Sequence, residues 1–169
     1  MQKMLEKTIK EMHSIFGDDR KRINHAMEVL KHSCAIYNGE FPGNNAGIIV
    51  ELAAVLHDIG IKQAESRYNS TAPFYQHREG PPLAKKVLEK AGADPKTTAR
   101  VLYIVGHHHY KSKIDGPDFQ ILWEADLIAN LPEFPVFSGN YARFEKMVNY
   151  NFKTRTGREI ALSLRERPE

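Results

Sequence analysis

The sequence is poor in cysteine and has no long apolar run. Cys34 is the single cysteine among 169 residues, so no internal disulfide can form and a reducing compartment is expected. The most apolar stretch, residues 46–56, is interrupted by Glu51 and is too short to span a bilayer. The N-terminal residues also lack the apolar core of a signal peptide. We therefore expect a cytoplasmic protein that does not interact with a membrane.

The chain also lacks a strong excess of either charge. Lys and Arg total 24 against 21 Asp and Glu, a formal net charge of only +3. Short basic runs such as residues 20–22 are typical of a solvated helix start, so nucleic acid is not expected as a partner. Hydrophobic residues make up 41% and charged residues 27%, which excludes a disordered chain and fits one globular domain over residues 1–169.

Helical periodicity dominates, and no alternating strand pattern is convincing, so an all-α fold is expected. Gly17, Gly92 and the pair Asp94-Pro95 are stop and start signals for helices, and Asp18 or Asp19 and Asn44 or Asn45 are candidate N-caps. The pattern predicts a bundle of about six to eight helices, at residues 2–16, 20–37, 46–57, 82–90, 95 to the histidines at 107–109, 119–131, and one or two between 140 and 165, interrupted near 156–157.

Two features of this bundle bear on function. The helix at 46–57 is apolar nearly all round and is expected at the centre. The helix at 20–37 is apolar on two sides, so His25 is expected to point into the protein. Residues 61–76, which include Pro73 and several aromatics, are predicted to be an irregular loop that acts as a lid or binds a ligand.

The pair His57-Asp58 lies at the end of the predicted central helix. A carboxylate is unfavourable there, because the helix C-terminus already carries partial negative charge and burial adds a further cost. A divalent metal ion or a nearby cation such as Lys62 would each relieve the problem. This pair alone does not decide between them.

Other histidines and a carboxylate favour the metal. His25 and Asp126 lie on apolar helices, and three consecutive histidines end a third. Each has an ordinary structural explanation taken singly, such as a hydrogen-bonded core histidine or a favourable helix C-terminus. Together they are side chains that buried helices could bring to one divalent ion.

The order His25, then His57-Asp58, then Asp126 resembles the HD superfamily of metal-dependent phosphohydrolases. The similarity covers about residues 20–131 and rests on three segments, Arg22-Ile23-Asn24-His25-Ala26, Leu52-Ala53-Ala54-Val55-Leu56-His57-Asp58-Ile59-Gly60 and Ala125-Asp126. The resemblance implies a helical bundle around one or two divalent ions (Fe, Mn, Ni, Co, Mg or Zn). It also implies that the metal ligands are His25, His57, Asp58 and Asp126.

The resemblance further implies that a second ion would use His77, His107 and His108, with Asp58 as a bridge. Neighbours on a helix point about 100° apart, so His109 is expected to be a bystander. The branch that degrades cyclic dinucleotides has a Lys directly after His-Asp-Ile-Gly and a Gly-Tyr-Pro signature. Here the Lys is displaced to Lys62 and the signature is not found, so cyclic di-GMP is not expected as a substrate.

The implied function is hydrolysis of a nucleotide or another small phosphate ester by a metal-activated hydroxide. Asp58 would orient the nucleophile, and Lys62 and Arg78 would offset charge on the phosphoryl group. Two alternatives remain. One is a non-catalytic module that binds metal and a nucleotide. The other is a helical nucleic-acid-binding protein, which gives the buried histidines and aspartates no role.

Overall fold

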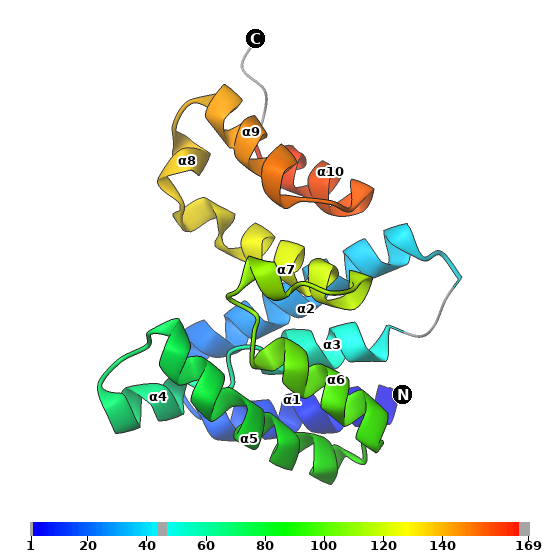
Figure 1. The fold of residues 1–169 in the computed structure, drawn as a ribbon, viewed down its shortest axis with the longest axis vertical. Coiled ribbons are helices and arrows are strands. Elements are labelled where there is room, and N and C mark those ends of the chain that lie inside the picture. The colour runs from blue at the N-terminus through cyan, green and yellow to red at the C-terminus, as the bar shows by residue number, and fades with distance from the viewer. Residues whose placement is uncertain (1, 44–46, 166–169) are drawn as a thin grey trace.

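The computed structural model describes residues 2–43 and 47–165, and the part of the chain that it describes is helical without a strand, as predicted (Figure 1). None of its helices is long and apolar enough to cross a membrane. The elements are α1 (Gln2–Phe16), α2 (Arg20–Glu40), α3 (Ile48–Leu56), α4 (Ile61–Tyr68), α5 (Pro73–Ala91), α6 (Pro95–Val105), the 3-10 helix η1 (Lys111–Lys113), α7 (Pro117–Asn130), the 3-10 helix η2 (Leu131–Glu133), α8 (Pro135–Ser138), α9 (Tyr141–Asn151) and α10 (Arg155–Ser163).

The predicted stop and start signals act where they are expected. Gly17 has a φ of 60° directly after α1, and Gly92 has a φ of 84° after α5, conformations that glycine adopts without strain. The side chain of Asp19 accepts a hydrogen bond from the Arg22 N–H, and Asp94 caps α6 in the same way. The predicted cap at Asn44 or Asn45 lies outside the described residues.

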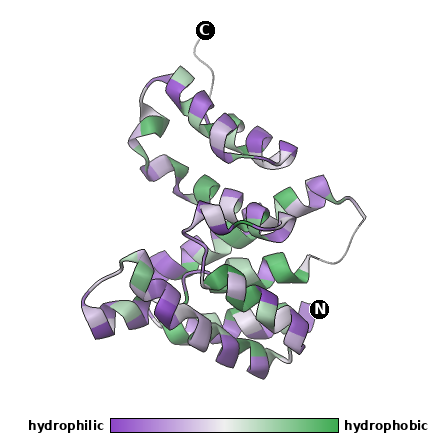
Figure 2. Cartoon of the chain, in the orientation of Figure 1, coloured by the Kyte–Doolittle hydropathy of each residue, from purple (hydrophilic) through white to green (hydrophobic). Residues whose placement is uncertain are grey.

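Helix α3 is the centre of the bundle. Its residues 52–56 are buried without exception, together with Val50, and it contacts α1, α2, α6 and α7. Figure 2 shows α3 as the most uniformly hydrophobic of the central helices. Because α3 is surrounded, the residues at its C-terminal end are delivered to the interior of the bundle. His57 and Asp58 follow directly.

The most extensive helix packing in the bundle is between α2 and α7, and α10 packs across both from the C-terminal side (Figure 1). The buried carboxylate of Glu124 on α7 accepts hydrogen bonds from the backbone N–H groups of Lys153 and Thr154. This ties the turn between α9 and α10 to α7. The C-terminal helices therefore hold α7 from one side while α2 and α3 hold it from the other.

The prediction of an irregular loop over residues 61–76 is wrong. Residues 61–68 form α4, which ends at Asn69 in the left-handed conformation, and α5 begins at Pro73. The helix expected at 82–90 therefore starts nine residues earlier, with Pro81 and Pro82 inside it. Proline favours the first turn of a helix, so these two prolines resemble a helix start, but Pro73 occupies that position.

Two smaller differences concern the count and the C-terminus. The additional α4 and the short α8 bring the described helices above the six to eight expected. The break between the last two helices falls at residues 152–154, where Thr154 caps α10, and not near 156–157.

Candidate metal centre

Three elements deliver the four predicted ligands to one place. His25 comes from the first half of α2, His57 and Asp58 follow α3, and Asp126 lies in the second half of α7. The Nε2 atom of His25 lies 3.2 Å from Nε2 of His57 and 3.1 Å from Oδ1 of Asp126. The Oδ2 atom of Asp58 lies 3.4 Å from His57 Nε2 and 3.8 Å from His25 Nε2. Residues from distant parts of the sequence thus meet.

These separations suit a shared divalent ion. Ligand atoms about 2.1 Å from a metal, at tetrahedral or octahedral angles, lie about 3.0 to 3.4 Å from one another. The shorter distances among His25, His57, Asp58 and Asp126 fall in that range. Two imidazoles and two carboxylates form a mixed nitrogen and oxygen set, which suits Mn, Fe, Co, Ni or Zn better than the all-oxygen preference of Mg.

The ligands are held in a suitable orientation by hydrogen bonds outside the cluster. Nδ1 of His57 donates to the carbonyl of Ala54 at 2.8 Å, which turns Nε2 toward the other ligands. That carbonyl is available because the last carbonyls of α3 have no helical partner. On α7, the amide of Asn130 donates to Oδ1 of Asp126 at 2.9 Å. Both ligands are therefore oriented before any ion arrives.

The charges of the cluster favour a shared cation. Burial opposes ionisation of Asp58, but His57 and His108 outweigh burial and hold the pKa of Asp58 well below its usual range. Burial also opposes protonation of His57, but Asp58 and Asp126 outweigh it and raise the pKa of His57 to about 9. In the metal-free protein, a proton on His57 supplies the positive charge that a metal ion would replace.

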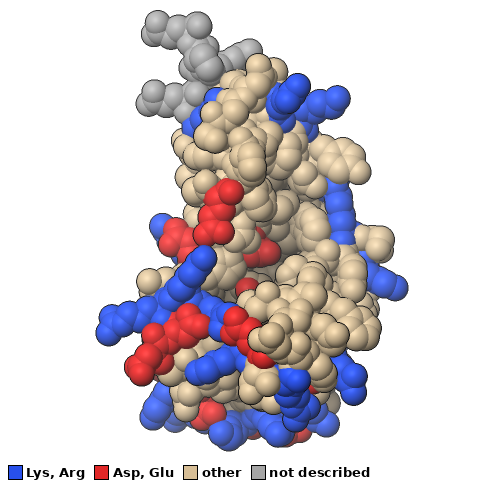
Figure 3. All heavy atoms as spheres, turned by 90° about the vertical axis from the view of Figure 1, so that its left-hand side faces the viewer, with Lys and Arg blue, Asp and Glu red and all other residues tan. Residues whose placement is uncertain are grey.

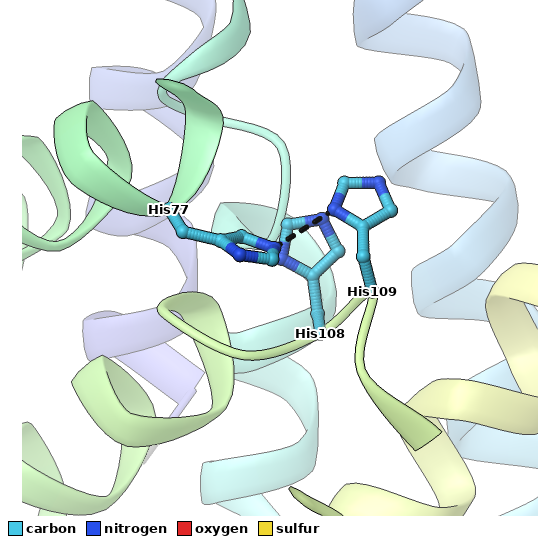
Figure 4. A group of neighbouring side chains, drawn as sticks. All are labelled: His77, His108 and His109. Atoms are coloured by element: carbon cyan, nitrogen blue, oxygen red, sulfur yellow. Dashed lines mark hydrogen bonds between the residues drawn. The ribbon is translucent and has the colours of Figure 1, made fainter. Parts of the chain in front are cut away.

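A second group of side chains adjoins the first. His77 of α5 meets His108 and His109, which lie in the turn after α6 (Figure 4), and their ligand atoms all lie within 4.8 Å of one another. Nε2 of His77 is 2.9 Å from Nδ1 of His109. Two buried nitrogens, Nδ1 of His77 and Nε2 of His108, have no hydrogen-bond partner. Unpaired buried polar atoms are costly, and a bound cation would satisfy a lone pair at such a position.

Asp58 lies between the two groups. Its Oδ2 faces His25 and His57, while its Oδ1 lies 3.3 Å from Nε2 of His108. Nδ1 of His108 donates to the Val105 carbonyl, which turns Nε2 toward this carboxylate oxygen. A metal ion between the two atoms would have a ligand on each side. This arrangement suits Asp58 as a bridge between two ions.

Two histidines of the second group, His77 and His109, are neutral near pH 7. Burial and the neighbouring His108 lower the pKa of His77 to about 4 and that of His109 to about 3. Their lone pairs are therefore available to a metal without the loss of a proton.

His107, which was expected to join His77 and His108, points elsewhere. Its Nδ1 donates to the Tyr103 carbonyl at 2.7 Å, and its ring packs against the Tyr103 ring. His109, expected to be a bystander, takes its place in the group. The expectation assumed that all three histidines continue a helix, but α6 ends at Val105 and the histidines follow in a turn.

The two basic residues expected to act in catalysis are not brought to the cluster. Nζ of Lys62 donates to the carbonyls of Ile15 and Phe16, at the C-terminal end of α1. The guanidinium of Arg78 lies over the Tyr68 ring, at 5.9 Å from its centroid. Neither residue lines the pocket that contains Asp58 and Asp126.

Arg22, expected only at a solvated helix start, does line this pocket, one helical turn before His25. That spacing is visible in the sequence, because residues three apart share a helix face.

The clusters open into a pocket of about 790 Å³, which lies between α2, α7 and the connection from α4 to α5. Figure 3 shows this face of the molecule hollowed, with acidic side chains inside the hollow and basic side chains beside it. The volume is typical of sites for small organic ligands. The pocket therefore has room for a substrate well beyond one phosphate group.

Close backbone packing positions the second group against the first. A Cβ on Gly60 would lie 2.7 Å from Cα of Gly80, closer than real Cβ contacts. Only glycine at position 60 lets α5 approach the turn that carries His57 and Asp58. His77 lies on α5 within one helical turn of Gly80, so this approach also brings His77 to Asp58.

Comparison of the chain with protein-family models, curated proteins and solved structures finds no match. No known relative therefore indicates what the site binds, and its chemistry is inferred from its residues and their geometry.

Proposed function

We propose that this protein is a metal-dependent phosphohydrolase of the HD type, which hydrolyses a nucleotide or another small phosphate ester. The observation that supports this best is the convergence of His25, His57, Asp58 and Asp126 at separations suited to one ion, in a pocket of substrate size. The adjoining histidines and the shared Asp58 support a second ion. The resemblance of the sequence to HD enzymes points to a phosphate ester as the substrate.

A bound divalent ion supplies a Lewis acid that acidifies water near neutral pH and offsets negative charge on phosphoryl oxygens. The side chains of the protein position the ligands. Asp58 places one carboxylate oxygen in each group, so it would serve as a ligand to an ion in either group. Asn130 and the Ala54 carbonyl keep Asp126 and His57 from rotating away. No separate general base is required.

The direct test compares Asp58→Ala with a matched control, Asp18→Ala, an exposed aspartate outside the pocket. Each protein is supplied with Mn²⁺, Fe²⁺, Co²⁺, Ni²⁺, Zn²⁺ or Mg²⁺ and assayed against a broad panel of phosphate compounds. Asp58→Ala should lower turnover by at least about 100-fold, because it removes a ligand of both ions, while Asp18→Ala stays at the wild-type level. If wild-type protein turns over no compound in the panel, the enzyme proposal fails. Tight metal and nucleotide binding without turnover would instead favour a non-catalytic binding module.

A further inference from the structure

The pocket continues beyond the metal ligands along α2, α7 and η2. We call this part the outer pocket and define it by Asn24, Glu28, His32, Asn130 and Glu133. It lies away from His77 and His108, on the side where α2 and α7 run past the ligands. It offers space for an organic group attached to the reacting phosphate.

Arg22 is the one partly buried arginine or lysine among the described residues that line the pocket. Its Nη1 lies 2.8 Å from Asp19 and 2.9 Å from Glu65, and its side chain is 21% exposed. Both of these contacts are made by Nη1. Asp19 and Glu65 thus hold Arg22 in place at the pocket, and a guanidinium carries five N–H donors, more than these two contacts use.

The described residues of the outer pocket carry no surplus of positive charge. Lys21 is 86% exposed, and its ammonium lies 3.7 Å from the carboxylate of Glu133. Glu28 adds another carboxylate, and burial lowers the pKa of the neighbouring His32, which is therefore neutral near pH 7. Among the described residues that line this space, a second phosphate group would face carboxylates with no free cation to offset its charge.

The same surface suits an uncharged or cationic group. Glu28 and Glu133 offer hydrogen-bond acceptors to hydroxyl or amine donors, and so does the amide oxygen of Asn130, whose nitrogen is already bonded to Asp126. Ile128 and Leu164 add apolar surface for a ring or chain. Hydrogen-bond acceptors beside apolar surface would suit a sugar, a nucleoside or an amino alcohol.

We propose that the substrate carries a single phosphate group, held by the metal centre and Arg22, and a neutral or cationic organic group that lies in the outer pocket. The substrate class is thus a phosphomonoester, and nucleoside di- and triphosphates are disfavoured. This inference rests on the proposed function, and it narrows that function.

The first experiment compares compounds that differ only in the number of phosphate groups, such as AMP, ADP and ATP, or a sugar monophosphate and its bisphosphate. With the full-length protein loaded with Mn²⁺, kcat/KM for each monophosphate should exceed that of its polyphosphate at least about tenfold. Equal or greater turnover of the polyphosphates overturns the inference and leaves the phosphohydrolase proposal standing. No turnover of any compound counts against the proposed function itself.

The second experiment measures binding without turnover. Calorimetry on the Mn²⁺-loaded protein compares the phosphonate analogue of AMP with α,β-methylene-ADP, each equilibrated with the same free Mn²⁺. The double variant Glu28→Gln with Glu133→Gln removes the two carboxylates of the outer pocket. It should reduce the ratio of affinities, monophosphonate over α,β-methylene-ADP, by about tenfold, or about threefold for each charge removed.

The matched control is Glu89→Gln, since Glu89 is exposed to a similar extent and lies 3.8 Å from Lys85, but outside the pocket. It should leave the preference unchanged. An unchanged preference in the double variant, or an equal shift in the control, would contradict the role of the outer pocket.

Discussion

Charge balance is the central property of the individual ligands. Asp58 and Asp126 lie within 4 Å of the imidazoles of His25 and His57, in a space where solvent screening is weak. Two carboxylates so placed repel each other unless a cation is shared between them. A proton on His57 meets this need in part, and a divalent ion meets it more fully. The cluster is therefore better suited to a cation than to a purely structural ion pair.

Three consecutive histidines allow a test at single-residue resolution. His109→Ala should weaken binding of the second ion by about 10- to 100-fold, because it removes a nitrogen that faces His77. His107→Ala should leave metal affinity unchanged, because His107 is bonded to the Tyr103 carbonyl instead. Titration of each purified variant with Mn²⁺ or Zn²⁺ measures both effects. A larger loss for His107→Ala than for His109→Ala would show that the assignment of the second group is wrong.

At the scale of elements, the site depends on how closely α5 packs against the turn after α3. Gly60 and Gly80 make this approach possible, and Tyr68 and Arg67 of α4 donate to the buried carboxylate of Glu79 on α5. These contacts tie helix α4 to helix α5. His77 depends on that pair for its distance to Asp58, whereas His25 and Asp126 do not.

This dependence predicts the effect of Gly60→Ala. The added methyl group would overlap the backbone of Gly80 and force α5 outward, which should cost about 2 to 4 kcal/mol of the free energy of unfolding. The variant should lose the second ion before the first, because only His77 is displaced. Denaturant unfolding and metal stoichiometry measure the two effects. Full stability with two ions bound would contradict the close packing described here.

A second pair of elements, α6 and α7, is joined by ion pairs away from the site. Arg100 donates to Asp118 at 2.6 and 2.7 Å and to the more exposed Asp115. Burial raises the pKa of Asp118, but Arg100 outweighs burial and lowers it. A lowered carboxyl pKa means that its stabilising effect is present above the unfolded pKa of about 4 and is lost as the pH falls through the lower pKa of the folded state.

Asp118→Asn should therefore reduce the free energy of unfolding at pH 7 by about 1 to 2 kcal/mol. The variant should also lose less stability than the wild type when the pH is lowered from about 7 to about 3. Urea unfolding at several pH values measures both quantities. Asp115→Asn serves as the comparison and should cost less, because Asp115 is twice as exposed as Asp118. An identical pH dependence in Asp118→Asn and wild type would exclude this contribution.

At the scale of the whole molecule, the sequence predicts the helical class and the central position of α3 well, because amphipathic spacing and end signals such as Gly17 and Asp94 act locally. It predicts α4 poorly, because residues 61–68 lack a strong cap and their helix is stabilised through Glu79, a contact that local sequence does not reveal. The four predicted ligands of the first group do come together.

Other parts of the site depend on tertiary geometry and could not be predicted. The choice between His107 and His109 is set by a turn, to which helical periodicity does not apply. Lys62 and Arg78 are near the ligands in sequence, but contacts with α1 and with Tyr68 direct them away from the pocket. Proximity along the chain was a poor guide to which cations face the site.

The proposed function requires that α2, α7 and the turn after α3 jointly bind a cation. The most direct measurement is anomalous diffraction from crystals of the protein equilibrated with Mn²⁺ or Zn²⁺. A strong anomalous peak is expected about 2.1 Å from the nearest atoms of His25, His57, Asp58 and Asp126. No peak between these side chains, or peaks confined to surface positions, would contradict the proposed function.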